Sequence, residues 1–400
     1  MSDGFVSTRC RACESTAFYE VLNLGSMPLA GDFLPAGDSN CLYPLAIDGC
    51  ESCGLLQVRK MVDPSTIFTP DYSFSSSTVP GLVQHFGDYA REVALPVGEA
   101  PRKRLLEVGC NDGVFLDPLS RVGYEVVGID ASENVVGMAR NKGLDVCAGF
   151  FGLQTAKDLL NRYGHFGVIT CSNVFAHNPL VNEFIEAVDA LLDPRQGEFW
   201  VEVHSAHKLY DGLQWDCFYH EHCFYWTIHA LRKCLGKHGY KLMRYKTTSM
   251  HGGALRAVFS KSNGSSEIEL VEQELTSHCW QDFTKRCERS RDLIQGCVEK
   301  LPIHYAYGAA GRAVTLINWT EIGGHLDFVV DGSPLRFGKS IPNTSLPIIS
   351  EEIFFKKEDL PPWCFVTAHN YLKGIKKKVN SHFPDKHTWF VTPLPCVVIQ

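Results

Sequence analysis

The sequence lacks any apolar run long enough to cross a membrane. No window reaches the roughly 18 apolar residues that a membrane-spanning helix needs, and the opening segment, MSDGFVSTRC, contains no apolar stretch typical of a secretory signal. Positive charge is also scarce, because 38 Lys and Arg stand against 45 Asp and Glu and give a formal net charge of −7. Proteins that bind nucleic acid by neutralising many phosphates need the opposite balance. We therefore expect a cytoplasmic protein that binds neither membranes nor nucleic acid.

The composition also lacks the marks of disorder and of a small disulfide-linked domain. Hydrophobic residues make up 45% and charged residues 21% of the chain, as in soluble globular proteins. Its 400 residues exceed what one hydrophobic core usually holds, so we expect two or three domains. Disulfide frameworks belong to small secreted domains, whereas most of the 16 cysteines here stand singly in apolar runs. Free thiols together with a metal site fit this pattern better.

Two C-x-x-C pairs near the N-terminus are a strong metal signal. The first pair is Cys10 and Cys13, and the second is Cys50 and Cys53. Four thiolates are the ligand set of closed, tetrahedral zinc sites, which have no open position for catalysis. The sequence therefore predicts a structural zinc ion that stabilises a small N-terminal core.

The stretch LLEVGCNDGVFLDPL, residues 105–119, lacks the dinucleotide fingerprint G-x-G-x-x-G but predicts the same strand, glycine loop and helix. Such a loop lies at the carboxyl end of a parallel strand, where open α/β sheets bind nucleotides. Glu107 would repel a pyrophosphate and favours a ligand with an ammonium group. Asp130 ends the next predicted strand and can accept hydrogen bonds from ribose hydroxyls. S-adenosylmethionine meets both demands, and the pattern resembles the Rossmann-like methyltransferases.

Strands and helices keep alternating after Asp130, which predicts a parallel sheet in a Rossmann-like α/β domain. The third strand is followed by Gly149 where many methyltransferases have an acid that binds adenine, so we expect backbone groups and Phe150 or Phe151 to do so here. His177 follows the fourth strand, on the rim of the sheet where ligands bind. The predicted cofactor-binding residues are Glu107, Gly109, Asn111, Asp112, Gly113, Asp130, Ala131, Ser132, Phe150 and Asn173.

A dense group of polar and aromatic residues follows the fifth predicted strand. Tyr219, His220, Glu221 and His222 put a phenol, two imidazoles and a carboxylate side by side. The spacing is not H-E-x-x-H, so the two histidines would not share a helical face for zinc. Acid–base catalysis fits better, because a histidine that is oriented by a carboxylate and has a pKa near neutral can remove a proton at pH 7.

The C-terminal third repeats the pattern of strand, glycine turn and helix. A long amphipathic helix is predicted over 267–300 and marks a domain boundary. After it, Gly308-x-x-Gly311 follows an apolar strand, and Arg312 at the start of the next helix could form an anion site. We expect a second, smaller Rossmann-like unit here. The predicted domains are a zinc-binding module at 1–70, a methyltransferase domain at 71–262 and a substrate-binding domain at 263–400.

Eight motifs occur in order along the chain: CRAC…CESC, LGSMPLA, EVGCNDGVFL, NVFAHNP, YHEH, HGGALR, YGAAGRAVTLIN and FVVDGSPLRFGKSIPNTSLPI. Together they resemble the S-adenosylmethionine-dependent C-methyltransferases of deoxysugar biosynthesis in secondary metabolism, including the nucleotide-sugar C-3′-methyltransferases. The resemblance covers nearly the whole chain. It implies a zinc-binding module, a central methyltransferase domain and a C-terminal domain that helps bind a nucleotide sugar.

The resemblance also implies residue roles. It makes His222 the general base, with Tyr219 and Glu221 beside it, and it directs Tyr72 and His177 toward the sugar. Tyr72 lies in a serine-rich loop that we interpret as a lid. The implied reaction removes the proton next to the ketone of a nucleotide-linked keto sugar, and the enolate attacks the methyl group of S-adenosylmethionine. The residues expected to bind the substrate are His251, Gly252, Gly253, Tyr307, Gly308, Arg312 and Asp331.

Alternatives remain open at this point. Relatives tend to have lysine where this chain has Arg312, which makes the activating group of the substrate less certain than the chemistry. The acceptor could be a carbon acid other than a sugar, or the chain could be a non-catalytic protein that binds a nucleotide ligand. A metal site at Cys217, His204 and His207 is a less favoured interpretation. We expect a monomer or a weak homodimer.

Overall fold

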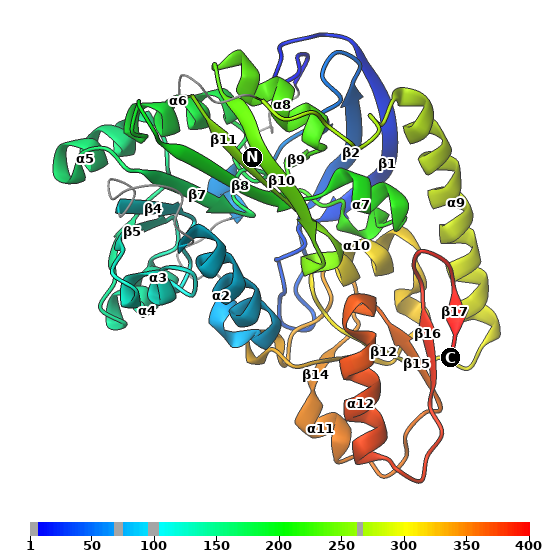
Figure 1. Cartoon of the computed structure of the whole chain (residues 1–400). Helices are drawn as coiled ribbons and strands as arrows, with labels where there is room; N and C mark the ends of the chain where they lie inside the picture. Colours follow the sequence, from blue (N-terminus) through cyan, green and yellow to red (C-terminus); the bar gives the residue numbers. More distant parts are fainter. Residues whose placement is uncertain (1–6, 68–74, 95–103, 262–266) are drawn as a thin grey trace.

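The computed structural model of the chain describes residues 7–67, 75–94, 104–261 and 267–400. These residues form three β-sheets of four, seven and six strands (Figure 1). The first sheet belongs to an N-terminal module, the second to a central domain and the third to a C-terminal domain. No helix within the described residues is both long and apolar enough to span a membrane.

The N-terminal sheet is antiparallel, and one of its strands comes from the central domain. β1 (Phe18–Pro28) pairs with β2 (Leu42–Cys50), which pairs with β3 (Leu56–Val58), and a short helix, α1 (Pro64–Ile67), follows. The fourth strand, β9 (Phe224–Tyr225), pairs with β3. Since β9 comes directly after the YHEH motif, the zinc module and the predicted catalytic segment are joined by one sheet.

The central sheet has the strand order β10-β11-β8-β7-β4-β5-β6. Its strands are β4 (Arg104–Val108), β5 (Glu125–Asp130), β6 (Asp145–Ala148), β7 (Val168–Ser172), β8 (Glu198–His204), β10 (Lys241–Thr248) and β11 (Ala254–Ser260). Pairs are parallel from β6 to β8, whereas β11 runs antiparallel to β8 and β10. The winding direction changes between β4 and β7, so the loops after these two strands border the crevice where such sheets bind ligands.

Helices cover both faces of this sheet, because their apolar residues recur at helical spacing. One face packs against α2 (Pro80–Ala94), α3 (Leu116–Arg121) and α4 (Glu133–Asn141). The other face packs against α5 (Leu153–Tyr163), α6 (Val181–Leu191) and α8 (Ile228–Lys237). A short helix, α7 (Ala206–Asp211), leads from β8 toward the YHEH motif.

The C-terminal sheet confirms the prediction of a second Rossmann-like unit. Its order is β14-β13-β12-β15-β16-β17, and all pairs are parallel except the last. The strands are β12 (Tyr305–Tyr307), β13 (Phe328–Asp331), β14 (Ile348–Ser350), β15 (Trp363–Val366), β16 (Trp389–Thr392) and β17 (Val398–Ile399). Its helices are α10 (Gly311–Trp319), α11 (Glu351–Phe355) and α12 (Leu372–His382).

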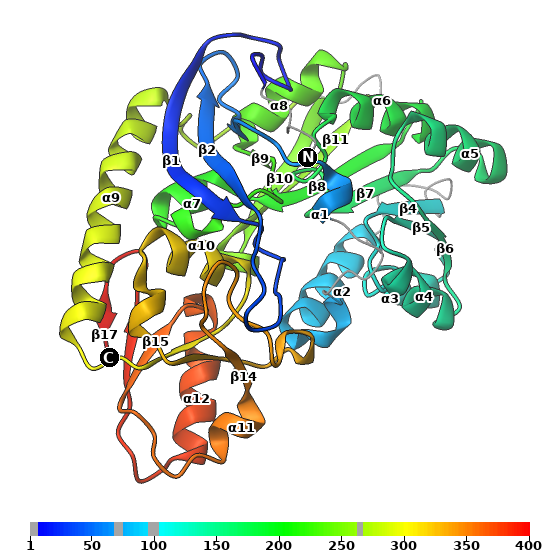
Figure 2. The same ribbon diagram turned by 180° about the vertical axis from the view of Figure 1, so that it is seen from behind.

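The long helix α9 (Ser277–Lys300) runs along one side of the molecule, beside β1 and on to the C-terminal domain (Figure 2). The helix predicted over 267–300 was wrong at its start. Residue 276 has extended backbone angles, and the backbone N–H of Ile268 donates to the carbonyl of Leu242 in β10. The segment before α9 does not form a helix, because its backbone bonds to β10 at Leu242.

Candidate active site and metal centre

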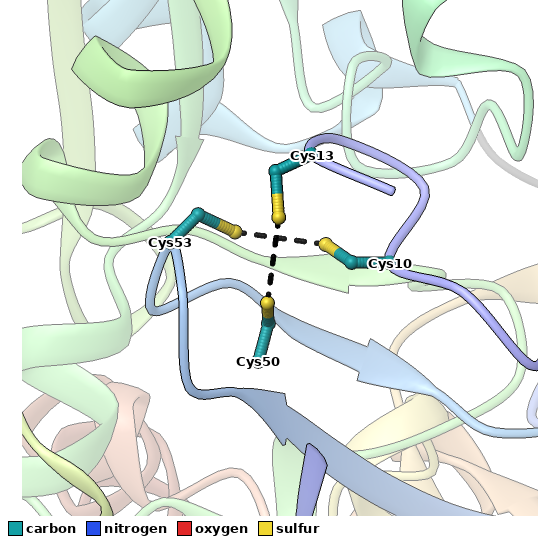
Figure 3. A group of neighbouring side chains, drawn as sticks. All are labelled: Cys10, Cys13, Cys50 and Cys53. Atoms are coloured by element: carbon teal, nitrogen blue, oxygen red, sulfur yellow. Dashed lines mark hydrogen bonds between the residues drawn. The ribbon is translucent and has the colours of Figure 1, made fainter. Parts of the chain in front are cut away.

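The four cysteine side chains of the two C-x-x-C pairs point toward one another (Figure 3). The Sγ atoms of Cys10 and Cys53 are 3.6 Å apart, those of Cys13 and Cys50 are 3.5 Å apart, and all four lie within 4.8 Å of one another. Sulfur atoms around a tetrahedral zinc with Zn–S bonds of about 2.3 Å would lie roughly 3.8 Å apart. The donor set and its spacing therefore fit a zinc ion.

The cysteine cluster is fastened to the central domain. Nδ2 of Asn182 in α6 donates to the carbonyl of Arg11 over 2.9 Å, and Nζ of Lys237 in α8 donates to the carbonyl of Ala12 over 3.2 Å. Three of the four cysteines are buried, and all four thiolates are available to one ion. A closed site of this kind stabilises a fold rather than activating a substrate.

A cavity of about 1300 Å³ opens at the carboxyl ends of β4, β5 and β7. At its floor, Gly109 has a φ of 75°, and a Cβ atom there would lie 2.0 Å from Val174 Cγ2, so only glycine fits. The wall also includes His177, His251 and residues of the zinc module such as Arg9. The predicted cofactor residues that line it are Glu107, Gly109, Asn111, Asp130, Ala131, Ser132, Phe150 and Asn173.

Two carboxyl groups give this cavity its electrostatic character. Asp130 accepts hydrogen bonds from the backbone N–H groups of Asn111 (2.9 Å) and Ser132 (3.0 Å), which fold the loop around it. Glu107 is 3% exposed, and its Oε2 atom has no hydrogen-bond partner among the described residues. Burial, reinforced by Asp130 and Asp112, raises the pKa of Glu107 well above its usual value, and burial also raises the pKa of Asp130. These groups fit a ligand that carries a positive charge and hydroxyl groups.

The YHEH motif forms a tight turn in which Tyr219 and His222 face each other. The backbone N–H of His222 donates to the carbonyl of Tyr219 (3.1 Å), and the Tyr219 hydroxyl lies 3.1 Å from His222 Nε2. Burial, together with His177 and other nearby histidines, lowers the pKa of His222 far below its usual value. The imidazole is therefore neutral at pH 7 and can accept a proton.

His177 connects this turn with the cavity. Its ring lies 4.9 Å from that of His222, and its Nδ1 atom donates to the backbone carbonyl of Glu221. That bond places the unprotonated nitrogen at Nε2. The Glu221 carboxylate turns away and accepts a hydrogen bond from the backbone N–H of Gly31 over 2.9 Å. Burial raises the pKa of Glu221 to about 7.

Models of three protein families match successive parts of the chain. "Putative zinc binding domain" matches residues 10–68, "Methyltransferase domain" matches 83–245 and "C-methyltransferase C-terminal domain" matches 249–395. The chain is also similar to C-methyltransferase NovU of Streptomyces niveus, with 26% identity over 96% of this chain and 95% of that protein. The chain belongs to the S-adenosylmethionine-dependent C-methyltransferases. This C-methyltransferase is an enzyme that uses S-adenosylmethionine as its cofactor and carries zinc.

More distant similarities cover smaller shares of the C-methyltransferase. The ubiquinone biosynthesis O-methyltransferase of Bordetella avium is 25% identical over 37% of this chain and 58% of its own length. Among solved structures, magnesium protoporphyrin IX methyltransferase (ChlM) from Synechocystis PCC 6803 with bound SAM covers 50% of this chain and 98% of its own, with 19% identity and a TM-score of 0.38.

Two predicted cofactor residues of the C-methyltransferase do not line the cavity. Asp112 accepts hydrogen bonds from the hydroxyl of Ser75 (2.9 Å) and the backbone N–H of Ser77 (3.2 Å), so it holds the segment before α2. Gly113 packs against Ala139 in α4 and Leu144 just after it, where a Cβ atom would lie 3.3 Å from Ala139 Cβ and 2.3 Å from Leu144 Cδ1. The sequence pattern could not separate these residues from Glu107, because all belong to one short loop.

The catalytic segment differs from its prediction in two respects. The pKa of His222 is lowered well below its usual value instead of lying near neutral. Among the described residues no carboxylate orients His222, since Glu221 bonds to Gly31 and the Tyr219 hydroxyl takes that place. Tyr72, the predicted lid residue, lies outside the described residues.

The alternative metal site is wrong. Within the described ranges, the four N-terminal cysteines are the only metal-ligating group of three or more residues. His207 Nε2 instead donates to the carbonyl of Gln273 (2.7 Å), and its Nδ1 lies 3.1 Å from Glu272 Oε2, so it does not join Cys217 or His204.

The residues expected to bind the substrate fall into two groups. His251 lines the cavity, but the others do not, and several already have partners within the protein. Asp331 accepts from the backbone N–H groups of Ala309 and Ser333, each at 2.7 Å. The Tyr307 hydroxyl donates to Glu351 over 2.6 Å.

Gly308, Gly252 and Gly253 have positive φ values of 106°, 89° and 133°, which explains why glycine stands at each position. Arg312 is paired with Asp216.

Two buried acidic residues were missed by the sequence analysis. Asp216 is fully buried in the aromatic run QWDCF and holds Arg312. Glu202, in the middle of β8, is bonded by His85 (2.6 Å) and Arg256 (2.8 Å) and so links α2 to the sheet. An acidic residue inside an apolar run was the available signal, because a buried charge requires a partner.

Proposed function

We propose that this enzyme methylates the carbon next to the ketone of a nucleotide-linked keto-deoxysugar, as a step of deoxysugar biosynthesis. The observation that carries the proposal is the Tyr219–His222 pair, whose hydroxyl and Nε2 atoms lie 3.1 Å apart. Neither residue lines the cofactor cavity, but the His222 ring lies 4.9 Å from the ring of His177, which does. Proton removal from a carbon acid needs a neutral base and a nearby donor for the developing enolate oxygen. This pair offers both.

His222 is the proposed base. Its lowered pKa keeps the imidazole unprotonated at neutral pH, and a developing enolate nearby would stabilise the imidazolium that forms. A positioned general base typically contributes ~10²–10⁴-fold to the rate. His177 and His222 stand close enough that only one of them is expected to carry a positive charge at a time.

Tyr219 is the proposed donor to the enolate oxygen. When the phenol turns from Nε2 toward the ketone oxygen of the substrate, it donates to that oxygen and frees the Nε2 lone pair, which then takes the proton from the neighbouring carbon. A donor placed where negative charge develops is worth roughly 10²–10³-fold. Proton uptake and oxygen stabilisation are thereby coupled within one turn of the chain.

S-adenosylmethionine supplies an electrophilic methyl group on a positively charged sulfur. Glu107 is proposed to bind its ammonium group, and Asp130 its ribose hydroxyls. Ligand pockets usually have volumes of about 300–1,000 Å³, whereas this cavity measures about 1300 Å³, so it has room for an acceptor beside the cofactor. Residues 263–400 would bind the nucleotide, 71–262 the cofactor and 1–70 the zinc.

Solvent deuterium exchange tests the proposal. The enzyme loaded with S-adenosylhomocysteine is incubated in deuterated buffer with a nucleotide-linked 4-keto sugar, and exchange at the carbon next to the ketone is followed by NMR. His222→Ala should slow exchange by roughly 10²–10⁴-fold.

His220→Ala is the matched control. Its ring faces Tyr43 of the zinc module, with 5.8 Å between ring centroids, so its removal should affect exchange far less. If His222→Ala exchanged as fast as the parent enzyme, the base would have to be His177, His251 or Tyr72.

A further inference from the structure

We propose that Arg312 is a positioning residue that holds two candidate catalytic loops in place from the C-terminal domain. One loop is the Tyr219–His222 turn, and the other is the loop that carries His251. This inference rests on the proposed function, because it assigns these loops to the reaction. It replaces the expectation that Arg312 binds an anionic group of the substrate.

The Arg312 guanidinium is held by a forked ion pair. Its Nε donates to Asp216 Oδ2 and its Nη2 to Asp216 Oδ1, each over 2.8 Å, and Nη2 also lies 3.1 Å from His369 Nε2. The Asp216 carboxylate is fully buried, and the Arg312 side chain is 17% exposed. The two side chains must keep this geometry, because separating them would leave a buried charge without a partner.

Asp216 transmits this constraint to the catalytic turn. It lies in a single helical turn, η3 (Trp215–Cys217), which ends directly before the segment containing Tyr219. The same stretch is fixed by edge-on packing of Trp215 against Trp319 in α10, with 4.7 Å between ring centroids. The hydroxyl of Thr315 in α10 also donates to the Phe218 carbonyl over 3.0 Å. Helix α10 thus sets the path of the chain into the turn.

The second loop touches the same guanidinium. Nη1 of Arg312 lies 3.5 Å from the carbonyl oxygen of His251. His251 itself has a φ of 54°, a left-handed conformation that is costly for a residue with a side chain and therefore needs support from its surroundings. Gln214 adds support by donating to the Gly252 carbonyl over 2.9 Å. His251 lines the cavity, so the strained backbone determines where its imidazole lies.

Guanidinium geometry suits this role better than substrate binding. Four of the N–H groups of Arg312 point at Asp216, His369 and His251, in three different segments. A lysine ammonium is a point charge and could not span them. With these donors engaged, Arg312 acts through the two loops and not on the substrate.

The test compares turnover with binding in Arg312→Ala. We expect kcat to fall by about 10²-fold, the loss that a displacement of about 1 Å in catalytic groups can cause. The KM for the acceptor and the affinity for S-adenosylhomocysteine should stay unchanged. Millimolar methylguanidinium should restore part of kcat by refilling the site. Arg59→Ala is the control, because Arg59 forms a similar forked pair with Asp48 inside the zinc module, and it should lower stability without lowering kcat.

A second variant guards against misfolding. Asp216→Asn combined with Arg312→Gln removes both buried charges but keeps polar groups, and it should show the same loss of kcat. Hydrogen–deuterium exchange of the full-length protein needs no acceptor. Protection should fall in residues 214–222 and 249–255 for Arg312→Ala and for the double variant, but not for Arg59→Ala. If no acceptor is turned over by the parent enzyme, the proposed function fails while this exchange measurement still judges Arg312. The inference would be overturned if Arg312→Ala raised only the KM for the acceptor, was not rescued by methylguanidinium and left the protection unchanged. That result would show that Arg312 binds the substrate.

Discussion

Asp130→Ala is the perturbation that most clearly separates cofactor binding from loop structure. Asp130 ends β5 and accepts two backbone N–H groups, those of Asn111 and Ser132. Its carboxylate also faces the cavity, where it is proposed to accept hydrogen bonds from the two ribose hydroxyls of the cofactor. The substitution removes those acceptors and loosens the loop that surrounds them.

The magnitude follows from the number of bonds lost. A hydrogen bond to a charged group contributes about 1.5–3 kcal/mol, and Asp130 is partly exposed, so we use the lower figure for each of the two ribose contacts. The sum of about 3 kcal/mol corresponds to roughly a 10²-fold weaker affinity, since 1.4 kcal/mol is tenfold. Isothermal titration calorimetry with S-adenosylhomocysteine measures this affinity directly. Asp130→Asn should lose less, because one amide oxygen can still accept a hydrogen bond.

Asp145→Ala provides the matched control. Asp145 lies at the opposite, amino end of a neighbouring strand, β6, where it is exposed and pairs with Arg162. Its removal should leave the affinity for S-adenosylhomocysteine unchanged. Equal losses in Asp130→Ala and Asp145→Ala, or tight binding of NAD without any response to S-adenosylhomocysteine, would refute the assignment of this cavity.

Three further predictions concern zinc, pH and the buried ion pairs. Cys53→Ser should lose its zinc and melt at a lower temperature, because metal binding in such modules is coupled to folding. A variant that kept full stability, and one zinc per chain by atomic absorption, would contradict this. Glu107, whose pKa burial raises well above its usual value, must be ionised to bind the ammonium group, so the affinity for the cofactor should be full above that pKa and fall as the pH drops through it. Calorimetry in buffers of different ionisation enthalpy should detect proton release below that pKa, and a pH-independent affinity would be the opposite result. Glu202→Gln should destabilise the central domain by about 3 kcal/mol, the lower end for breaking a buried pair, because Arg256 loses its buried partner and keeps only the partly exposed Glu92; an unchanged urea midpoint would contradict that role.

Much of the fold could be predicted because its signals are local. The strand at 198–204 is buried on both faces, and the apolar residues 199–201 and 203 within it made it recognisable. The four zinc ligands were predictable from two short spacings, and the structure brings them together. The start of α9 was missed because residues 267–276 bond to other elements, with Ile268 on β10 and Gln273 on α7, and such tertiary hydrogen bonds cannot be read from the composition of the segment itself.

The site was less predictable, because it depends on contacts between distant parts of the chain. Arg312 follows a glycine turn that suggests an anion site, yet its partner Asp216 is 96 residues earlier in the chain. Glu221 is beside His222 in sequence, but the turn directs its carboxylate to Gly31, 190 residues away. Motif spacing identified the segments that meet at the cavity. The direction of each side chain was set by tertiary packing.

The central claim, methyl transfer to carbon, is tested most directly by the fate of a labelled methyl group. The enzyme is incubated with 13C-methyl S-adenosylmethionine and a panel of nucleotide-linked keto sugars, with non-sugar carbon acids in parallel, and the products are examined by NMR. The account predicts a new methyl signal coupled to the sugar carbon next to the ketone, and loss of this signal with His222→Ala. A label found only on oxygen or nitrogen, only on a non-sugar acid, or on no acceptor at all would contradict it.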